Sequence, residues 1–322
     1  MKPKTIAVLT SGGDAPGMNA AVRSVVRTAL YRGMNVKGVL QGYNGLFESD
    51  VIDLGARSVS DIIQKGGTVL GTARSEKFRT AEGVKEAADK CRELGIDGIV
   101  VIGGDGSFRG ARDLSLAGIP CIGVPATIDN DIASTEYTIG FDTAMNTACE
   151  MADRLRDTSQ SHRRCSIIEV MGRRAGHLAL EVGTAVGATS ILVPEVPYDL
   201  KKDVIDRILY AKENGKMHYL IVVAESICNV DEMAKQVQEA TGIDTRATIL
   251  GHIQRGGRPT VRDRVMATKM GFAAVELLKE GIGNRVVALK NGEIVNYDIY
   301  EALNMSKSVN TDALHMAHII SI

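Results

Sequence analysis

Residues 98–107 read GIVVIGGDGS, and this stretch decides the fold. Its first half is an apolar run rich in Val and Ile, which is typical of a β-strand covered on both faces of its sheet. The run ends in three glycines around Asp105, and a helical pattern follows. The same order occurs earlier, where residues 5–10 lead into the loop SGGDAPG at 11–17 and then into a helix. Two such units indicate an α/β protein.

The rest of the chain repeats this alternation of short apolar runs and helical patterns. Parallel strands need crossover connections, and these are usually helices. We therefore predict an α/β fold with doubly wound parallel sheets. The expected strands are 5–10, 36–40, 98–102, 120–124, 166–170, 190–193 and 218–224, and the expected helices include 19–32, 81–94, 144–158, 175–186, 201–214 and 231–241.

Composition narrows the class of protein. The 322 residues are enough for two domains, and 44% apolar with 24% charged residues is typical of a globular protein. A net charge of −1 gives no reason to expect nucleic acid or a membrane surface as partner. The five cysteines are odd in number and form no CxxC, which predicts reduced thiols in a cytoplasmic protein. We expect neither a signal peptide nor a membrane helix.

Glycines follow two of the predicted strands, where ligands bind in doubly wound sheets. Glycine lets a ligand approach the backbone, and a helix N-terminus offers free N–H groups to an anion. Two such loops predict a polyphosphate site. Neither loop matches the Walker A or the G-x-G-x-x-G pattern, so a nicotinamide cofactor is not favoured. Asp105 is placed either to hold Mg²⁺ against phosphate oxygens or to cap the following helix, which is the commoner role.

The stretch GVPATIDNDI at 123–132 raises a different question. An apolar run opens there onto Thr127, Asp129, Asn130 and Asp131, which is more polar groups than a solvated turn requires. We interpret this loop as part of a site. Arginines beside other strand ends suit phosphate recognition, although each alone is typical of a surface residue. Arg23 and Arg27 are spaced by four on the first helix and share a face, which is either an anion site or an ordinary basic surface.

Taken together, these motifs resemble one family, the bacterial-type 6-phosphofructokinases. The matching stretches keep the family's order from residue 9 to residue 264 and read LTSGGDAPGMNA, GGT-LGTAR, VVIGGDGS, TIDND, TIGFDTA, DRLRDT-SH, EVMGR, P-EV, TRAT-LGHIQRGG and DR. The resemblance implies Mg²⁺-dependent transfer of phosphate from ATP to the 1-hydroxyl of fructose 6-phosphate. It also implies two lobes, a nucleotide-binding lobe over 1–139 plus 254–305 and a sugar-phosphate and effector lobe over 140–253 plus 306–322.

The resemblance assigns roles to single residues. It implies that Asp129 is the general base and that Thr127 and Arg173 act at the reacting centre, with Asp105 on the metal. The implied ATP-binding residues are Gly12, Arg74, Ser75, Gly103, Gly104, Asp105, Gly106 and Ser107. The implied sugar-phosphate residues are Thr127, Asp129, Asp131, Arg164, Met171, Gly172, Arg173, Glu225, Arg246, His252 and Arg255. Arg164 and Arg246 match positions that reach the 6-phosphate from a neighbouring subunit of a homotetramer.

The implied effector site is for ADP or phosphoenolpyruvate between subunits. Its residues would be Arg23, Arg27, Arg156, Gly187, Lys216 and His218. The sequence departs from the family pattern nearby, with Thr189 where a Glu is common, Met217 for a Lys, and Ala56-Arg57 for an Arg-aromatic pair. These departures predict weakened or altered control, with poor activation by ADP.

Two alternatives stay open. The first is a pyrophosphate-dependent enzyme of the same fold. Ala126 stands where ATP users commonly have Gly and pyrophosphate users Lys, and Gly106 stands where pyrophosphate users carry Asp; both points favour ATP. The second is an inactive sugar-phosphate sensor, which the presence of Asp105, Thr127, Asp129 and Arg173 disfavours. Lipid and NAD kinases share the GGDG loop but lack the TIDND, MGR and HIQRGG motifs.

Overall fold

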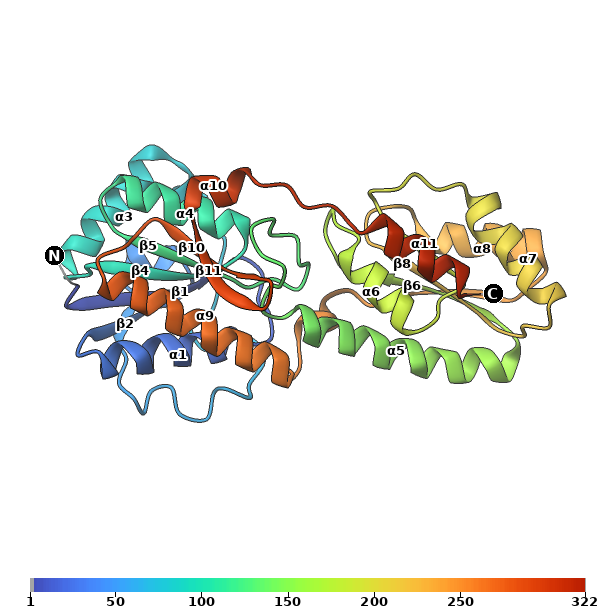
Figure 1. Ribbon diagram of the computed structural model, residues 1–322, viewed down its shortest axis with the longest axis horizontal. Helices are drawn as coiled ribbons and strands as arrows, with labels where there is room; N and C mark the ends of the chain where they lie inside the picture. The colour runs from blue at the N-terminus through green and yellow to red at the C-terminus, as the bar shows by residue number, and fades with distance from the viewer. Residues whose placement is uncertain (1–2, 322) are drawn as a thin grey trace. The chain divides into compact units, whose positions relative to one another are not determined.

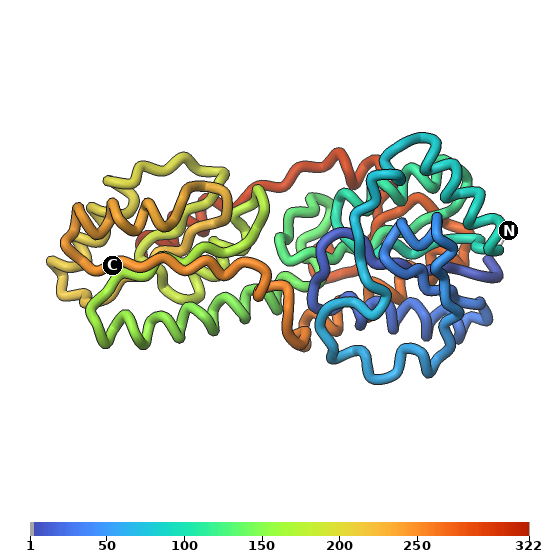
Figure 2. Tube along the Cα trace, turned by 180° about the vertical axis from the view of Figure 1, so that it is seen from behind, coloured from blue at the N-terminus to red at the C-terminus, as the bar shows by residue number. Residues whose placement is uncertain are grey.

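The computed structural model describes residues 3–321, and their contacts divide them into two compact units. Unit 1 comprises the described residues up to Ile128, then Ile132–Thr143 and Arg255–Lys307. Unit 2 comprises Asp129–Asp131, Ala144–Gln254 and the described residues from Ser308 on. The chain thus leaves and re-enters unit 1 several times, as can be followed in Figure 2. The short loop Asp129–Asp131 belongs to unit 2 although unit 1 flanks it on both sides.

Unit 1 contains a seven-stranded sheet in the order β11-β10-β5-β4-β1-β2-β3. Its centre is parallel, as predicted, and only the edge pairs β2–β3 and β10–β11 are antiparallel. The sequence analysis did not predict β3, β10 and β11. β3 is short and mostly exposed, and β11 is mostly half-buried, so their apolar patterns are weak, whereas the middle of β10 is buried. The strands are β1 (Thr5–Ser11), β2 (Asn35–Val39), β3 (Val51–Asp53), β4 (Gly98–Gly103), β5 (Cys121–Pro125), β10 (Arg285–Lys290) and β11 (Glu293–Asp298).

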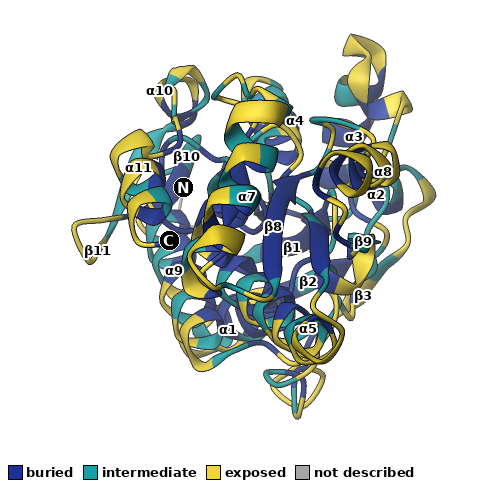
Figure 3. Cartoon of the chain, turned by 90° about the vertical axis from the view of Figure 1, so that its right-hand side faces the viewer, coloured by how far each residue is buried: buried dark blue, intermediate teal, exposed yellow. Residues whose placement is uncertain are grey.

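Helices cover both faces of this sheet, which makes it doubly wound (Figure 1). One face carries α1 (Met18–Tyr31) and α9 (Val261–Lys279), which pack against each other. The other carries α3 (Ala81–Glu93), α4 (Asp105–Leu116) and α10 (Ile299–Asn304), with the short α2 (Asn44–Glu48) and η1 (Lys77–Arg79) nearby. Every residue of β4 is buried, and so is every residue of β1 after Thr5; Figure 3 shows β1 in the colour of buried residues. The apolar runs of the sequence therefore form the core.

Unit 2 repeats the architecture on a smaller scale. Its four parallel strands follow the order β7-β8-β6-β9. They are β6 (Cys165–Val170), β7 (Ser190–Leu192), β8 (Tyr219–Ala224) and β9 (Thr245–Ile249). The helices are α5 (Phe141–His162), which begins in unit 1, α6 (His177–Ala185), α7 (Asp206–Glu213), α8 (Val230–Thr241), α11 (Thr311–Ile319) and the 3₁₀ turn η3 (Gly251–Arg255), whose last residue belongs to unit 1. The helix expected over 201–214 consists of a π-helical turn, η2 (Lys201–Ile205), followed by α7.

Two further findings bear on the class of protein. Within residues 3–321, no helix is long and apolar enough to cross a membrane. All five cysteines are free, and Cys91, Cys121 and Cys165 are buried. Burial raises the pKa of the Cys91 thiol to about 12, so this side chain is protonated at neutral pH and acts as a small core residue.

Candidate active site

The two glycine loops lie side by side because their strands are neighbours. β1 and β4 pair in parallel, with Ser11 opposite Gly103, so both loops leave the same edge of the sheet. Gly12 has a φ of 89°, a conformation that favours glycine, and its carbonyl accepts a hydrogen bond of 2.7 Å from the Thr72 hydroxyl. α4 begins directly at Asp105. The structure therefore brings the predicted phosphate loops together, with the N-terminus of α4 beside them.

The glycines of the second loop differ in what surrounds them. A Cβ added at Gly103 would lie 2.4 Å from the Ser11 carbonyl oxygen, so this glycine is required by close packing within the protein. A Cβ at Gly104 or Gly106 would meet no protein atom within 4 Å. Packing therefore does not explain the latter two glycines. They leave the backbone open to solvent, which is what the predicted phosphate site requires.

A buried tyrosine contacts the end of the GGDGS loop from the protein interior. Tyr43 donates a hydrogen bond of 2.6 Å to the Ser107 carbonyl, and its ring stacks on Phe78 with centroids 4.0 Å apart. Burial raises the pKa of Tyr43 well above its ordinary value, so the hydroxyl stays protonated and remains a donor. Sequence reasoning missed Tyr43 because no local motif links it to a loop 64 residues further along the chain.

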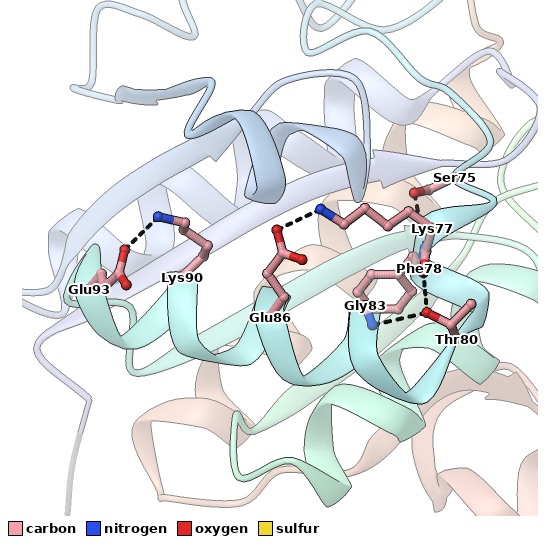
Figure 4. Close-up of polar contacts among 8 residues, drawn as sticks. All are labelled: Ser75, Lys77, Phe78, Thr80, Gly83, Glu86, Lys90 and Glu93. Atoms are coloured by element: carbon pink, nitrogen blue, oxygen red, sulfur yellow. Dashed lines mark hydrogen bonds and ion pairs between the residues drawn. The ribbon is translucent and has the colours of Figure 1, made fainter.

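Arg74 and Ser75 precede the turn η1 and the helix α3, and Figure 4 shows Ser75 there. The Ser75 hydroxyl accepts a hydrogen bond of 3.3 Å from the backbone N–H of Phe78, and Thr80 caps α3 by accepting from the N–H of Gly83 at 3.0 Å. These caps fix the direction of the chain. The Arg74 side chain is exposed, whereas Ser75 is half-buried. A local turn thus orients both predicted nucleotide contacts.

The loop that follows β5 is held by a parallel segment. Ala126 forms a bridge with Ile139, and the Thr138 hydroxyl donates a hydrogen bond of 2.7 Å to the Thr127 carbonyl. Thr127, Asp129 and Asn130 are 8%, 5% and 7% exposed. Because β5 lies next to β4, Thr127 follows the strand end beside the GGDGS loop. A buried carboxylate directly after that point, Asp129, suits proton transfer more than solvation.

In unit 2 the loop after β6 contains Met171, Gly172 and Arg173. Glu225 accepts hydrogen bonds from the backbone N–H groups of Gly172, at 3.2 Å, and Arg173, at 2.5 Å. The N–H of Met171 donates to the Gln254 side-chain oxygen at 2.9 Å, a contact that no sequence signal indicates. Glu225 and Gln254 therefore shape this loop.

The side chain of Arg173 extends from this loop toward Asp131. Its guanidinium lies 3.7 Å from the carboxylate of Asp131. Arg173 has a φ of 62°, and its side chain is 69% exposed. Because the rest of that side chain is open to solvent, its charge is available to a bound anion.

The predicted phosphate-binding arginines fall into two places. Arg164 and Arg246 of unit 2 both form ion pairs with one carboxylate, Asp244, at 2.5 and 3.5 Å.

Arg255 lies in unit 1, where it donates a hydrogen bond of 3.1 Å to the Asp14 carbonyl. Its guanidinium covers Gly13, where an added Cβ would be 2.5 Å away. His252 belongs to unit 2 and is exposed on η3.

The predicted effector residues also divide between the units. Arg23 and Arg27 share a face of α1 in unit 1, and burial and then the charge of Arg27 lower the pKa of Arg23. Arg156, Lys216 and His218 belong to unit 2. Burial lowers the pKa of Lys216 and of His218, and the nearby charge of Arg156 lowers both further.

Two contacts in unit 2 bear on this cluster. The side chain of Arg156 donates to the Val186 carbonyl, next to Gly187. The ammonium of Lys216 donates a hydrogen bond of 2.9 Å to the carbonyl of Ser321. The chain itself therefore supplies a hydrogen-bond partner to two of the predicted effector residues.

These features define a doubly wound α/β protein with two glycine loops and a buried carboxylate after adjacent strand ends. The chain belongs to the phosphofructokinase family, whose model matches residues 5–278. It is 55% identical over 318 residues to an ATP-dependent 6-phosphofructokinase of Clostridium botulinum (strain Loch Maree / Type A3), with 99% of each chain covered.

Solved structures agree on the fold. A phosphofructokinase from Saccharomyces cerevisiae is 35% identical and superposes with a TM-score of 0.87, over 99% of this chain and 48% of that one. A pyrophosphate-dependent phosphofructokinase from Marinobacter aquaeolei has a TM-score of 0.86 over 98% of this chain and 91% of that one. At 22% identity, the latter shows the fold alone.

Proposed function

We propose that this member of the family phosphorylates fructose 6-phosphate with Mg-ATP, with Asp129 as the general base. The γ-phosphate of ATP passes to the 1-hydroxyl, the hydroxyl proton passes to the base, and fructose 1,6-bisphosphate and ADP leave. One observation carries the proposal: the ends of the adjacent strands β1, β4 and β5 carry two phosphate loops and the Thr127–Asp129 loop. The reaction belongs to glycolysis, and the free thiols support a cytoplasmic location.

Phosphoryl transfer depends mainly on positioning and on neutralising charge, together with a group that accepts the attacking proton. Asp129 follows the strand end nearest the phosphate loops and is buried, so its carboxylate is shielded from water. Thr127 would contact the sugar or the moving phosphoryl group. The exposed guanidinium of Arg173 would stabilise charge on that group, while its contact with Asp131 orients it.

Magnesium fits the residues that are present. Within the described part of the chain, no three His, Cys, Asp or Glu side chains gather in a way that would hold a metal ion alone. Mg²⁺ commonly binds through one or two carboxylates plus substrate phosphates and water. Asp105, at the start of α4 beside Gly104 and Gly106, would be such a carboxylate. When bound, the ion would neutralise charge on the transferring phosphate.

Most of the residues proposed to bind the sugar phosphate belong to unit 2. The loop at Met171–Arg173 would contact the sugar, and Glu225 keeps it in shape through the two backbone hydrogen bonds described above. Arg164, Arg246 and Arg255 would bind the 6-phosphate, with His252 beside it. This assignment requires that the two ion pairs on Asp244 open or reorient when phosphate arrives.

The donor test decides between ATP and pyrophosphate. We expect the purified protein to form fructose 1,6-bisphosphate with Mg-ATP and not with pyrophosphate, because the open backbone at Gly106 leaves room for a nucleotide phosphate. Turnover with pyrophosphate alone would mean that the donor is misassigned. A folded protein without turnover on either donor would favour the inactive sensor.

We expect active sites to be shared between subunits of a homotetramer. Separately, Asp129→Ala lacks the base and Arg246→Ala lacks an arginine proposed to reach a neighbouring subunit's sugar phosphate. Mixed tetramers would contain sites in which both residues are intact, so mixing should restore part of the activity. The measurement is turnover after subunit exchange, with exchange verified by mass spectrometry. No recovery despite verified exchange would place Arg246 in its own subunit's site.

ADP is expected to activate poorly at sub-saturating fructose 6-phosphate. Thr189 supplies no carboxylate for a metal on the effector, and the ammonium of Lys216 already donates to Ser321. The measurement is the rate against ADP concentration, with nucleotide inhibition at the ATP site separated by varying ATP. Strong activation would contradict the prediction.

A further inference from the structure

A fully buried carboxylate outside the proposed catalytic set ties several elements of unit 1 together. Asp263, near the start of α9, is 0% exposed. One of its oxygens accepts hydrogen bonds from the Tyr137 hydroxyl at 2.5 Å and the Gly140 N–H at 2.7 Å. The other accepts from the N–H and the hydroxyl of Thr143, at 2.9 and 2.5 Å. Four donors converge on one carboxylate that has no contact with solvent.

The arrangement identifies Asp263 as an acceptor on both oxygens. The Thr143 hydroxyl itself accepts a hydrogen bond of 3.0 Å from the Thr260 N–H, so its proton points at Asp263. Burial raises the pKa of Asp263, while the surrounding donors lower it. Gly140 and Thr143 flank the start of α5, so Asp263 caps that helix from another element. Arg262 lies over the ring of Tyr137 at 4.6 Å and closes the cluster.

The residues between Tyr137 and Gly140 support the catalytic loop. Within this segment, Thr138 donates to the Thr127 carbonyl, and the Ile139 N–H donates to the Pro125 carbonyl at 3.0 Å. Asp263 thus holds both ends of a four-residue segment whose middle is hydrogen-bonded to the loop. Thr127 and Ile128 lead directly into Asp129.

The same segment is packed tightly from the other side. A Cβ added at Gly17, which ends the SGGDAPG loop, would lie 2.6 Å from Ile139 and 3.5 Å from Asp263. A Cβ at Gly140 would lie 2.7 Å from Ala15. The segment therefore has little freedom to move while its ends are held.

We infer that Asp263 is a positioning residue for phosphoryl transfer, acting through Tyr137–Gly140 on the loop that carries Thr127 and Asp129. The inference rests on the proposed function of that loop. Asp263 is fully buried and lies outside the set of residues proposed to contact substrate. Its carboxylate fixes the backbone from which the base projects, and small errors in such positions strongly lower rates.

Asp263→Asn tests the inference sharply. Each oxygen of Asp263 faces one backbone N–H, so an amide NH₂ opposes an N–H in either orientation. We expect kcat to fall by about 10- to 100-fold while KM for either substrate changes by less than about threefold. Thr138→Val, which removes the hydrogen bond to the Thr127 carbonyl and leaves Asp263 in place, should lower kcat in the same way.

The double variant and a control separate positioning from simple loss of stability. If Asp263 acts through Thr138, the double variant should be no slower than the slower single variant. Leu278→Ala, in the buried C-terminal part of α9, should lower Tm but leave kcat at 15 °C unchanged. Only variants that are folded at that temperature are compared.

Several results would overturn the inference. One is a folded Asp263→Asn protein with kcat within about twofold of the unsubstituted enzyme, and another is effects of the two substitutions that multiply. If Asp263→Asn does not fold, Thr138→Val decides alone, and an unchanged kcat there overturns the inference. Failure of the unsubstituted protein to phosphorylate fructose 6-phosphate would instead reject the proposed function, so the two failures are distinguishable.

Discussion

Asp129→Asn is expected to lower kcat for fructose 1,6-bisphosphate formation by about 10²- to 10⁴-fold. Asparagine has nearly the shape of aspartate but cannot accept the proton of the attacking hydroxyl. Because Asp129 is only 5% exposed, water does not readily replace the missing base. KM for ATP should change little, since the phosphate loops are untouched. The measurement is steady-state turnover with Mg-ATP, with Tm recorded to confirm folding.

A matched control removes a carboxylate elsewhere in the same way. Asp53→Asn breaks an ion pair with Lys37 in which the aspartate side chain is 87% exposed, and such pairs contribute about 0–1 kcal/mol to stability. It should leave kcat unchanged. If folded Asp129→Asn kept more than about a tenth of the unsubstituted kcat, another group would be the base.

Gly106→Asp is expected to weaken ATP binding by about 100-fold. No protein atom lies within 4 Å of a Cβ at Gly106, so the side chain itself fits. A carboxylate in the first turn of α4 is favourable for the helix, so the fold should be retained. However, the new carboxylate would repel a phosphate charge about 5 Å away by about 3 kcal/mol at an effective dielectric constant of 20, which opposes ATP binding. That energy corresponds to the expected change in affinity.

Gly106→Asn and Gly106→Ala separate charge from size. Asparagine matches the volume of aspartate without its charge, so KM for ATP should rise much less than with Gly106→Asp. Alanine should raise the free energy of unfolding by about 0.5–1 kcal/mol, because glycine is unfavourable within a helix. The measurements are KM for ATP and for fructose 6-phosphate, the latter expected to stay constant. Equal KM values for ATP in all four proteins would remove the nucleotide from this loop.

The fold could be read largely from the sequence because the central strands are continuous apolar runs. β1, β4 and β8 are buried on both faces, so each of their residues is selected for burial and the pattern is unbroken. The outer strands β3 and β11 face solvent in part, and their mixed polarity hid them. The π-helical turn at 201–205 was missed as well, because its residues have an ordinary helical pattern.

Part of the candidate site, like part of the fold, could be predicted from the sequence. Local motifs pointed to Gly12, Asp105 and Thr127–Asp131, because phosphate binding and proton transfer need particular residue types within a few positions. By itself the sequence determined this set and the family resemblance. In the sequence, Gly103, Gly104 and Gly106 look alike. The structure distinguishes them, because close packing requires Gly103, whereas the space beside Gly104 and Gly106 is open.

Only the tertiary structure decided how the site loops are supported. Tyr43 reaches Ser107 across 64 residues, Thr138 reaches Thr127, and Asp263 reaches Tyr137 across 126 residues. The physical reason is that a buried hydrogen bond depends on where two groups meet in space, and a buried polar group must find a partner wherever the fold provides one. Such pairs leave no periodicity or spacing in the chain.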